Sequence, residues 1–304
     1  MQALATAVLP VFLLILLGFG LRRRGWIADG FWEPAERLCY FFLLPALLVT
    51  SLAGADFASL PAAAMAGAVV LAIVAMSGLL LVFQLATGGD GPAFTALLQT
   101  SIRPNTYIGL SIPFALYGEA GLTIAALIVA AVVPTVNLIS VAALVRFGGP
   151  YTGRNPSLTR ALLLNPLILA CLAGLALNLS GLGLPPVAAE TLAILARAAL
   201  PLALLAVGAG LDLGAARASG TRVGAAVALK LAGLPLLTAA TCWLLGVDGV
   251  AWSVAMLFNA LPTATSAYIL ARQMGGAPAL VANILTVQTL AAALTLPLLV
   301  LLIA

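Results

Sequence analysis

Long apolar runs dominate this chain and constrain its fold more than any other feature. Of its 304 residues, 63% are hydrophobic and 7% are charged, whereas soluble domains carry about 25% charged residues. A helix needs about 20 apolar residues to cross a bilayer, so we predict an all-α membrane protein with ten transmembrane helices. The ten runs cover residues 3–21, 35–53, 60–85, 93–117, 121–145, 162–180, 188–211, 222–246, 249–273 and 277–303.

The positive charges lie on one side of this layout. Arginines cluster in and beside the loops that follow the odd-numbered runs, from Arg22, Arg23 and Arg24 to Arg272, whereas the loops after the second, fourth, sixth and eighth runs contain no Lys or Arg. The positive-inside rule therefore places the odd loops in the cytoplasm and both termini outside. We predict a multi-pass protein of the plasma (inner) membrane, surrounded by the lipid bilayer.

The two halves of the chain repeat one another. A shift of 156 positions superimposes Gly18 on Gly174, and a shift of 158 superimposes Pro104 on Pro262. Each half has an odd number of runs, so the second half must enter the membrane in the opposite sense, which is typical of secondary transporters. We predict a first five-helix repeat, a cytoplasmic connecting loop and a second, inverted five-helix repeat, over residues 1–147, 148–161 and 162–304.

Two equivalent runs carry a proline and polar residues near their centres. Pro104, between Arg103 and Asn105, interrupts the fourth run, and Pro262 holds the corresponding place in the ninth. Proline lacks an N–H and clashes with the carbonyl four residues earlier, so each break frees backbone groups that must face protein or water. Half-helix N-termini are partly positive, and Arg103 adds a full charge. We therefore predict an anion-binding site where the breaks meet.

The candidate substrate-binding residues lie at these breaks and in the neighbouring runs. Several have a structural alternative: the arginine can pair with a carbonyl, residues 105–107 can satisfy the broken backbone, and polar residues of the fifth and tenth runs can bond between helices. The candidates are Arg103, Pro104, Asn105, Thr106, Tyr107, Asn137, Asn259, Pro262, Thr263, Thr265, Asn283 and Gln288.

Residue types needed for other chemistries are missing. Histidine is absent, and the three cysteines lie far apart without a CxxC pair. No acidic residue lies clearly within the middle of a run, because Asp29, Glu33 and Glu36 precede or flank the second run. Cation–proton antiporters, metal centres and membrane-embedded enzymes need such groups. We therefore predict no enzyme activity, no catalytic residue, no metal and no cofactor, and the net charge of +4 does not suggest nucleic acid.

Four segments, in this order, form a pattern: LPALL, RPNTYIGL, LKLAGLPLL and NALPTATSAYILA, at residues 44–48, 103–110, 229–237 and 259–271. The pattern resembles the auxin efflux carrier (AEC) family of bacterial type, which is related to the plant PIN auxin exporters. The resemblance covers nearly the whole chain. The chain lacks the long central hydrophilic loop of the plant proteins and has Arg103 directly before the proline, so auxin itself is not implied as the substrate.

The resemblance implies an NhaA-like or bile-acid-symporter-like fold, in which broken helices 4 and 9 cross. Helices 1, 2, 6 and 7 would form a scaffold, and helices 3–5 and 8–10 a transport domain. It also implies a secondary active or facilitative carrier that moves a small organic anion (a carboxylate) by an elevator-type mechanism. The alternative is a non-transporting membrane sensor or scaffold built on a transporter fold. A coupling ion (proton or sodium) and a homodimer are left open.

Overall fold

Every regular element in the described part of the chain is helical. The computed structural model describes residues 2–55, 61–150, 164–216 and 220–303. Three short elements depart from α geometry: the 3-10 helix η1 and the π-helices η2 and η3. In chain order the elements are α1 (Gln2–Arg23), η1 (Asp29–Phe31), α2 (Trp32–Leu38), η2 (Cys39–Leu43), α3 (Leu44–Ala53), α4 (Ala62–Thr87), α5 (Gly91–Ile102), α6 (Thr106–Phe147), α8 (Pro166–Ser180), α9 (Pro186–Ala209), α10 (Leu213–Ala216), α11 (Thr221–Ala228), η3 (Leu229–Gly233), α12 (Leu234–Leu244), α13 (Gly249–Asn259), α14 (Ser266–Gln273) and α15 (Pro278–Ile303).

Several helical segments are long and apolar enough to cross a membrane, as expected for an all-α membrane protein. The shorter helices α8 and α13 are apolar as well. The count of ten crossings stays a prediction, and the predicted connecting loop over 148–161 lies mostly outside the described residues. Within the described residues, six segments meet the length and composition of a span: Asp29–Ala53, Ala62–Thr87, Gly91–Phe147, Pro186–Ala209, Thr221–Leu244 and Pro278–Ile303.

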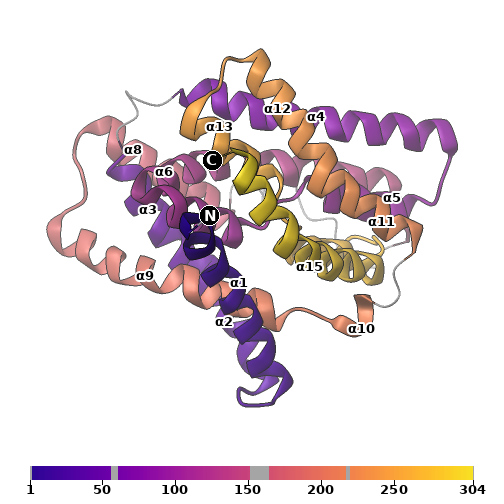
Figure 1. Cartoon of the computed structure of the whole chain (residues 1–304), viewed down its shortest axis with the longest axis horizontal. Helices are drawn as coiled ribbons and strands as arrows, with labels where there is room; N and C mark the ends of the chain where they lie inside the picture. The colour runs from indigo at the N-terminus through magenta and orange to yellow at the C-terminus, as the bar shows by residue number, and fades with distance from the viewer. Residues whose placement is uncertain (1, 56–60, 151–163, 217–219, 304) are drawn as a thin grey trace.

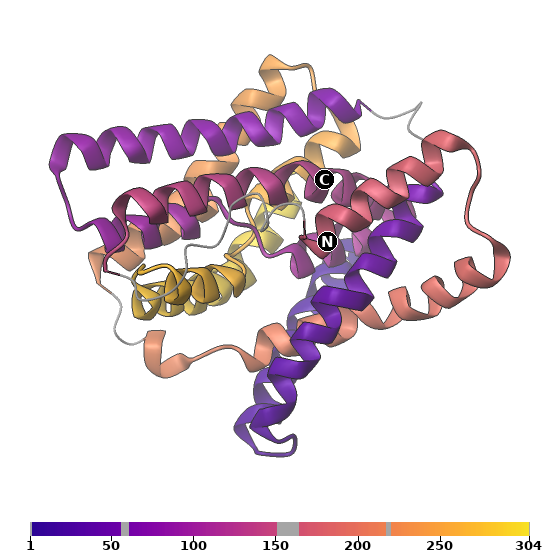
Figure 2. The same cartoon turned by 180° about the vertical axis from the view of Figure 1, so that it is seen from behind.

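The helices gather into two groups, with α6 between them. Helices α1, α3, α8 and α9 pack on one another, and α4, α5, α12, α13 and α15 form the second group. Helix α6 contacts members of both groups. In Figure 1 and in the reverse view of Figure 2, α9 follows one edge of the molecule and α4 the opposite edge. A kink at Gly118, whose φ is 60°, divides α6 into two helical parts.

Close glycine contacts join helices of the first group at related positions of the two halves. A Cβ added to Gly18 of α1 would lie 2.0 Å from the carbonyl oxygen of Leu205 in α9. A Cβ added to Gly174 of α8 would lie 3.1 Å from that of Val49 in α3. The shift of 156 positions that relates the two glycines also relates Val49 to Leu205. The same kind of helix contact therefore occurs twice, each time between the two halves of the chain.

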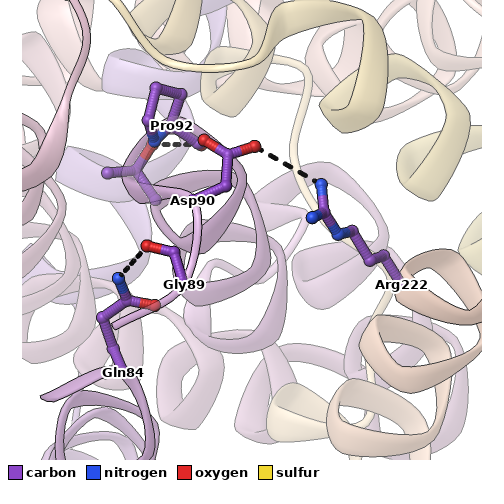
Figure 3. A network of polar contacts seen from close by, with 6 residues as sticks. Gln84, Gly89, Asp90, Pro92 and Arg222 are labelled. Carbon is purple, nitrogen blue, oxygen red and sulfur yellow. Dashed lines mark hydrogen bonds and ion pairs between the residues drawn. The ribbon is translucent and has the colours of Figure 1, made fainter. Parts of the chain in front are cut away.

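Polar contacts fix the turn between α4 and α5 (Figure 3). The side-chain amide of Gln84 donates to the carbonyl oxygen of Gly89 at 2.7 Å, and Asp90 forms an ion pair with Arg222 of α11 at 3.4 Å. The side chains of this pair are 51% and 61% exposed, and exposed pairs contribute about 1 kcal/mol at most. The hydrogen bond from the Gln84 side chain therefore holds the turn more firmly than the ion pair between Asp90 and Arg222.

Candidate functional site

The fourth and ninth apolar runs are both interrupted, and their interruptions touch. Residues 103–105 separate α5 from α6, and residues 260–265 separate α13 from α14. The backbone N–H of Asn105 donates to the carbonyl oxygen of Pro262 at 2.8 Å. Because this bond joins main chain to main chain, it satisfies two of the backbone groups that the interruptions expose.

A cavity of about 500 Å³ opens beside the joined interruptions. We call it the Arg103 cavity. Its walls come from α2 and η2, from residues 103–107, from α6, from the start of α8 and from residues 264–273, so it lies between the two groups of helices. Six of the predicted candidates line it: Arg103, Asn105, Thr106, Tyr107, Asn137 and Thr265.

Arg103 brings a positive charge to this cavity. The residue is only 7% exposed, and its Nη2 donates to the Oδ1 of Asn137. Its Nη1 is buried and has no hydrogen-bond partner in the described part of the chain. Neither of the ion pairs found among the described residues involves Arg103. A buried charge without a counter-charge is costly. An anion that enters the cavity would therefore stabilise the charged form of Arg103.

Asn105 caps the start of α6. Its Oδ1 accepts hydrogen bonds from the backbone N–H groups of Tyr107 at 3.1 Å and Ile108 at 3.3 Å, as asparagine commonly does at an N-cap. These two N–H groups are therefore occupied within the protein. The side-chain Nδ2 of Asn105 donates to no residue that the structure describes, so the amide rather than the helix start can contact a ligand.

The start of α14 supplies a second set of donors. The backbone N–H groups of Ala264, Thr265 and Ser266 have no acceptor among the described residues, and all three residues line the Arg103 cavity. The N-terminus of a helix carries unsatisfied N–H groups and a partial positive charge. The hydroxyl of Thr265 donates to the Oε1 of Glu36 in α2. A carboxylate of the protein itself thus lies at this helix start.

Three other predicted candidates are buried between helices and do not line this cavity. The side-chain oxygen of Gln288 in α15 accepts from the N–H of Thr263 at 3.0 Å. Its side-chain nitrogen donates to the carbonyl of Thr100 in α5 at 3.1 Å and to that of Ala226 in α11 at 3.0 Å. The Thr263 hydroxyl donates to the same Thr100 carbonyl at 2.6 Å, and the Asn259 amide to the hydroxyl of Thr238 at 2.7 Å. The bond to the N–H of Thr263 satisfies a group that the interruption of the ninth run leaves open. The bonds to the Thr100 carbonyl satisfy the group four residues before Pro104 in the fourth run.

The remaining candidates are the prolines and one asparagine. Pro104 and Pro262 form the interruptions themselves, and Asn283 of α15 is not part of the cavity wall.

Several polar residues of the Arg103 cavity are not among the predicted candidates. Asn165 carried a recognisable signal, because an asparagine directly before a proline at the start of an apolar run is typical of a helix N-cap; its Oδ1 accepts from the N–H of Leu167 at 3.0 Å. Glu36 carried a weaker one, as the only acidic residue of the second run. The polar lining residues outside the candidate set are Glu33, Glu36, Arg37, Tyr40, Asn165, Ser266 and Gln273.

A second cavity, of about 540 Å³, lies beside the next turn of α6. Tyr107 lines the Arg103 cavity and Ser111 lines the second one, and the Ser111 hydroxyl donates to the carbonyl of Tyr107 at 2.7 Å. Glu119 and Arg197 also belong to the wall of the second cavity. One turn of α6 therefore contributes to both cavities.

Known proteins similar to this chain are transporters. Residues 154–300 match the family model described as Membrane transport protein, which covers the auxin efflux carriers. A protein of Methanothermobacter thermautotrophicus described as an uncharacterized transporter is 24% identical over 294 residues, which span 96% of this chain and 95% of that protein. The similarities point to a membrane transporter and not to an enzyme.

Proposed function

We propose that this protein is a secondary carrier for a small organic anion with a carboxylate group. The observation that supports this most strongly is the composition of the Arg103 cavity. It combines a buried arginine, whose Nη1 lacks a partner, with N–H groups at the start of α14 that lack an acceptor, both within the described part of the chain. Both favour negative charge.

The substrate carboxylate binds between Arg103 and the start of α14 in this proposal. Asn105, Thr106, Tyr107 and Asn137 supply the remaining polar contacts, because they line the same cavity. Asn259, Thr263 and Gln288 have a supporting role: their hydrogen bonds hold the interrupted helices in place. The substrate thus meets donors from both interruptions at once.

The carrier works by an elevator-type movement of one helix group against the other. The position of the Arg103 cavity between the groups supports this, as does the second cavity beside the next turn of α6. The Arg103 cavity opens beside Arg37 and Gln273, on the side that the arginine pattern assigns to the cytoplasm. The structure then corresponds to a cytoplasm-facing state.

Ten spans in two inverted five-helix repeats are part of this proposal. The matching contacts of Gly18 with Leu205 and of Gly174 with Val49 support a duplicated unit. The contact between the two interruptions supports helices that cross at their breaks, as in NhaA-like folds.

Counterflow in proteoliposomes tests the proposal. Purified protein is first melted in the presence of acetate, malonate and malate, because a true ligand raises the melting temperature by mass action. Vesicles loaded with the best stabiliser should then accumulate the labelled anion from outside. Stabilisation without any flux would favour the alternative, a sensor or scaffold on a transporter fold. The absence of both stabilisation and flux with every anion would contradict the proposal.

A further inference from the structure

We propose that Glu36 is an internal competitor of the substrate: its carboxylate occupies the binding position at the start of α14 in the empty carrier, and the substrate carboxylate exchanges with it. This inference rests on the proposed function. It assigns a role to a residue that lies outside the predicted site.

Glu36 contacts the start of α14. Its Oε1 accepts a hydrogen bond from the hydroxyl of Thr265, the residue directly before α14. Glu36 also lines the Arg103 cavity, where the N–H groups of residues 264–266 lack an acceptor among the described residues. Glu36 forms no ion pair with Arg103 or with any other described residue. Among the described residues, its carboxylate is therefore held by the Thr265 hydroxyl alone, a donor that also suits a substrate carboxylate.

Two carboxylates cannot share the Thr265 hydroxyl at little cost. A donor hydrogen serves one strong acceptor, and like charges held close together disfavour one another. A substrate carboxylate that accepts the Thr265 hydroxyl must therefore displace Glu36. The displaced side chain has room to move, because it is only partly buried and its cavity is open.

The exchange also links binding to movement. Glu36 belongs to α2, which packs on α9 of the first helix group, whereas Thr265 precedes α14, which packs on α5 and α15 of the second. Their hydrogen bond connects the two helix groups when the site is empty. A substrate that accepts the Thr265 hydroxyl breaks this connection. The helix groups of the loaded carrier therefore move relative to each other more readily than those of the empty carrier.

The test compares Glu36→Gln with Glu190→Gln. Glu190 of α9 is exposed, lines neither of the two cavities and has no ion pair among the described residues, so its change matches the charge lost. Binding of malonate and malate is measured from melting shifts, and transport from counterflow. Glu36→Gln should tighten anion binding at least about tenfold, or ~1.4 kcal/mol, whereas Glu190→Gln should leave it near the wild-type value.

Two further measurements separate competition from a structural role. Thr265→Val should weaken anion binding, because it removes a donor that the substrate needs. Net efflux into anion-free medium should be slow relative to exchange in the wild type and should move toward the exchange rate in Glu36→Gln, because a neutral amide oxygen accepts the Thr265 hydroxyl more weakly than a carboxylate does.

The outcomes separate this inference from the proposed function. Saturable anion uptake by the wild type, with equal or weaker binding in Glu36→Gln, would overturn the role of Glu36 and leave the carrier function intact. No binding or flux in the wild type or in either variant would overturn both.

Discussion

At the scale of single residues, burial of a charge does not by itself mark a binding site. Lys230 in η3 is fully buried and its Nζ has no hydrogen-bond partner in the described part of the chain, yet it lines neither of the two cavities described above. Arg103 is also buried but lies in the wall of a cavity together with other donors. Arg103 therefore differs from Lys230 because several hydrogen-bond donors surround the same cavity.

Removal of the Arg103 charge should weaken anion binding strongly. Hydrogen bonds to charged groups contribute about 1.5–3 kcal/mol, so Arg103→Gln should raise the dissociation constant by about 10- to 150-fold. Melting shifts with malonate and malate measure the effect. The protein without ligand should keep or gain stability, because the variant removes a buried charge without a counter-ion.

Arg222→Gln serves as the control for Arg103→Gln. It also removes an arginine charge, but from the exposed pair with Asp90, and should leave anion binding unchanged. Equal binding by Arg103→Gln and the wild type would remove Arg103 from the site.

At the scale of elements, the helix interruptions could be predicted from the sequence. Which polar residues line the cavity, and which form hydrogen bonds between helices, could not. A proline between polar residues breaks a helix for local reasons that are visible in the chain. Whether Thr263 or Thr265 faces the cavity depends on which helix packs against each, and that is decided by residues distant in sequence, such as Gln288 and Glu36. For the same reason the contact of Glu36 with Thr265 could not be predicted from the sequence.

Close packing of α1 on α9 predicts a graded response to added methyl groups. Gly18→Ala should lower the melting temperature clearly, because its Cβ would lie 2.0 Å from a backbone oxygen, and overpacking costs about 1–3 kcal/mol. Gly174→Ala should cost less, because its nearest contact is 2.9 Å. Gly20→Ala in the same α1 has open space and should not destabilise. Thermal unfolding in detergent checks the order, and a destabilised Gly20→Ala would contradict it.

Loss of the Gln288 amide should disturb the interrupted ninth run. Gln288→Leu leaves the N–H of Thr263 without its acceptor, and a buried unsatisfied group costs about 1–3 kcal/mol. We expect a lower melting temperature and reduced counterflow. Gln273→Leu, a change at an exposed glutamine, should keep the stability of the wild type. Wild-type stability of Gln288→Leu would show that the interruption does not need this support.

At the scale of the whole molecule, the arrangement of charges predicts the orientation in the membrane. The three native cysteines are free and buried, so an introduced surface thiol can be labelled selectively. Ser180→Cys, at the end of the sixth run, should react with an impermeant maleimide on intact cells. Thr87→Cys, which follows the third, should react only after the membrane is opened. Both positions are exposed in the structure. The reverse labelling pattern would place the termini in the cytoplasm.

The bond between the N–H of Asn105 and the carbonyl of Pro262 has a consequence for how such carriers diversify. Because no side chain takes part in it, few substitutions at these positions can abolish it. Substitutions in the surrounding cavity wall can therefore accumulate while the two interrupted runs stay joined. In the proposed carrier, related proteins could then differ in their substrates and keep the same connection between these runs.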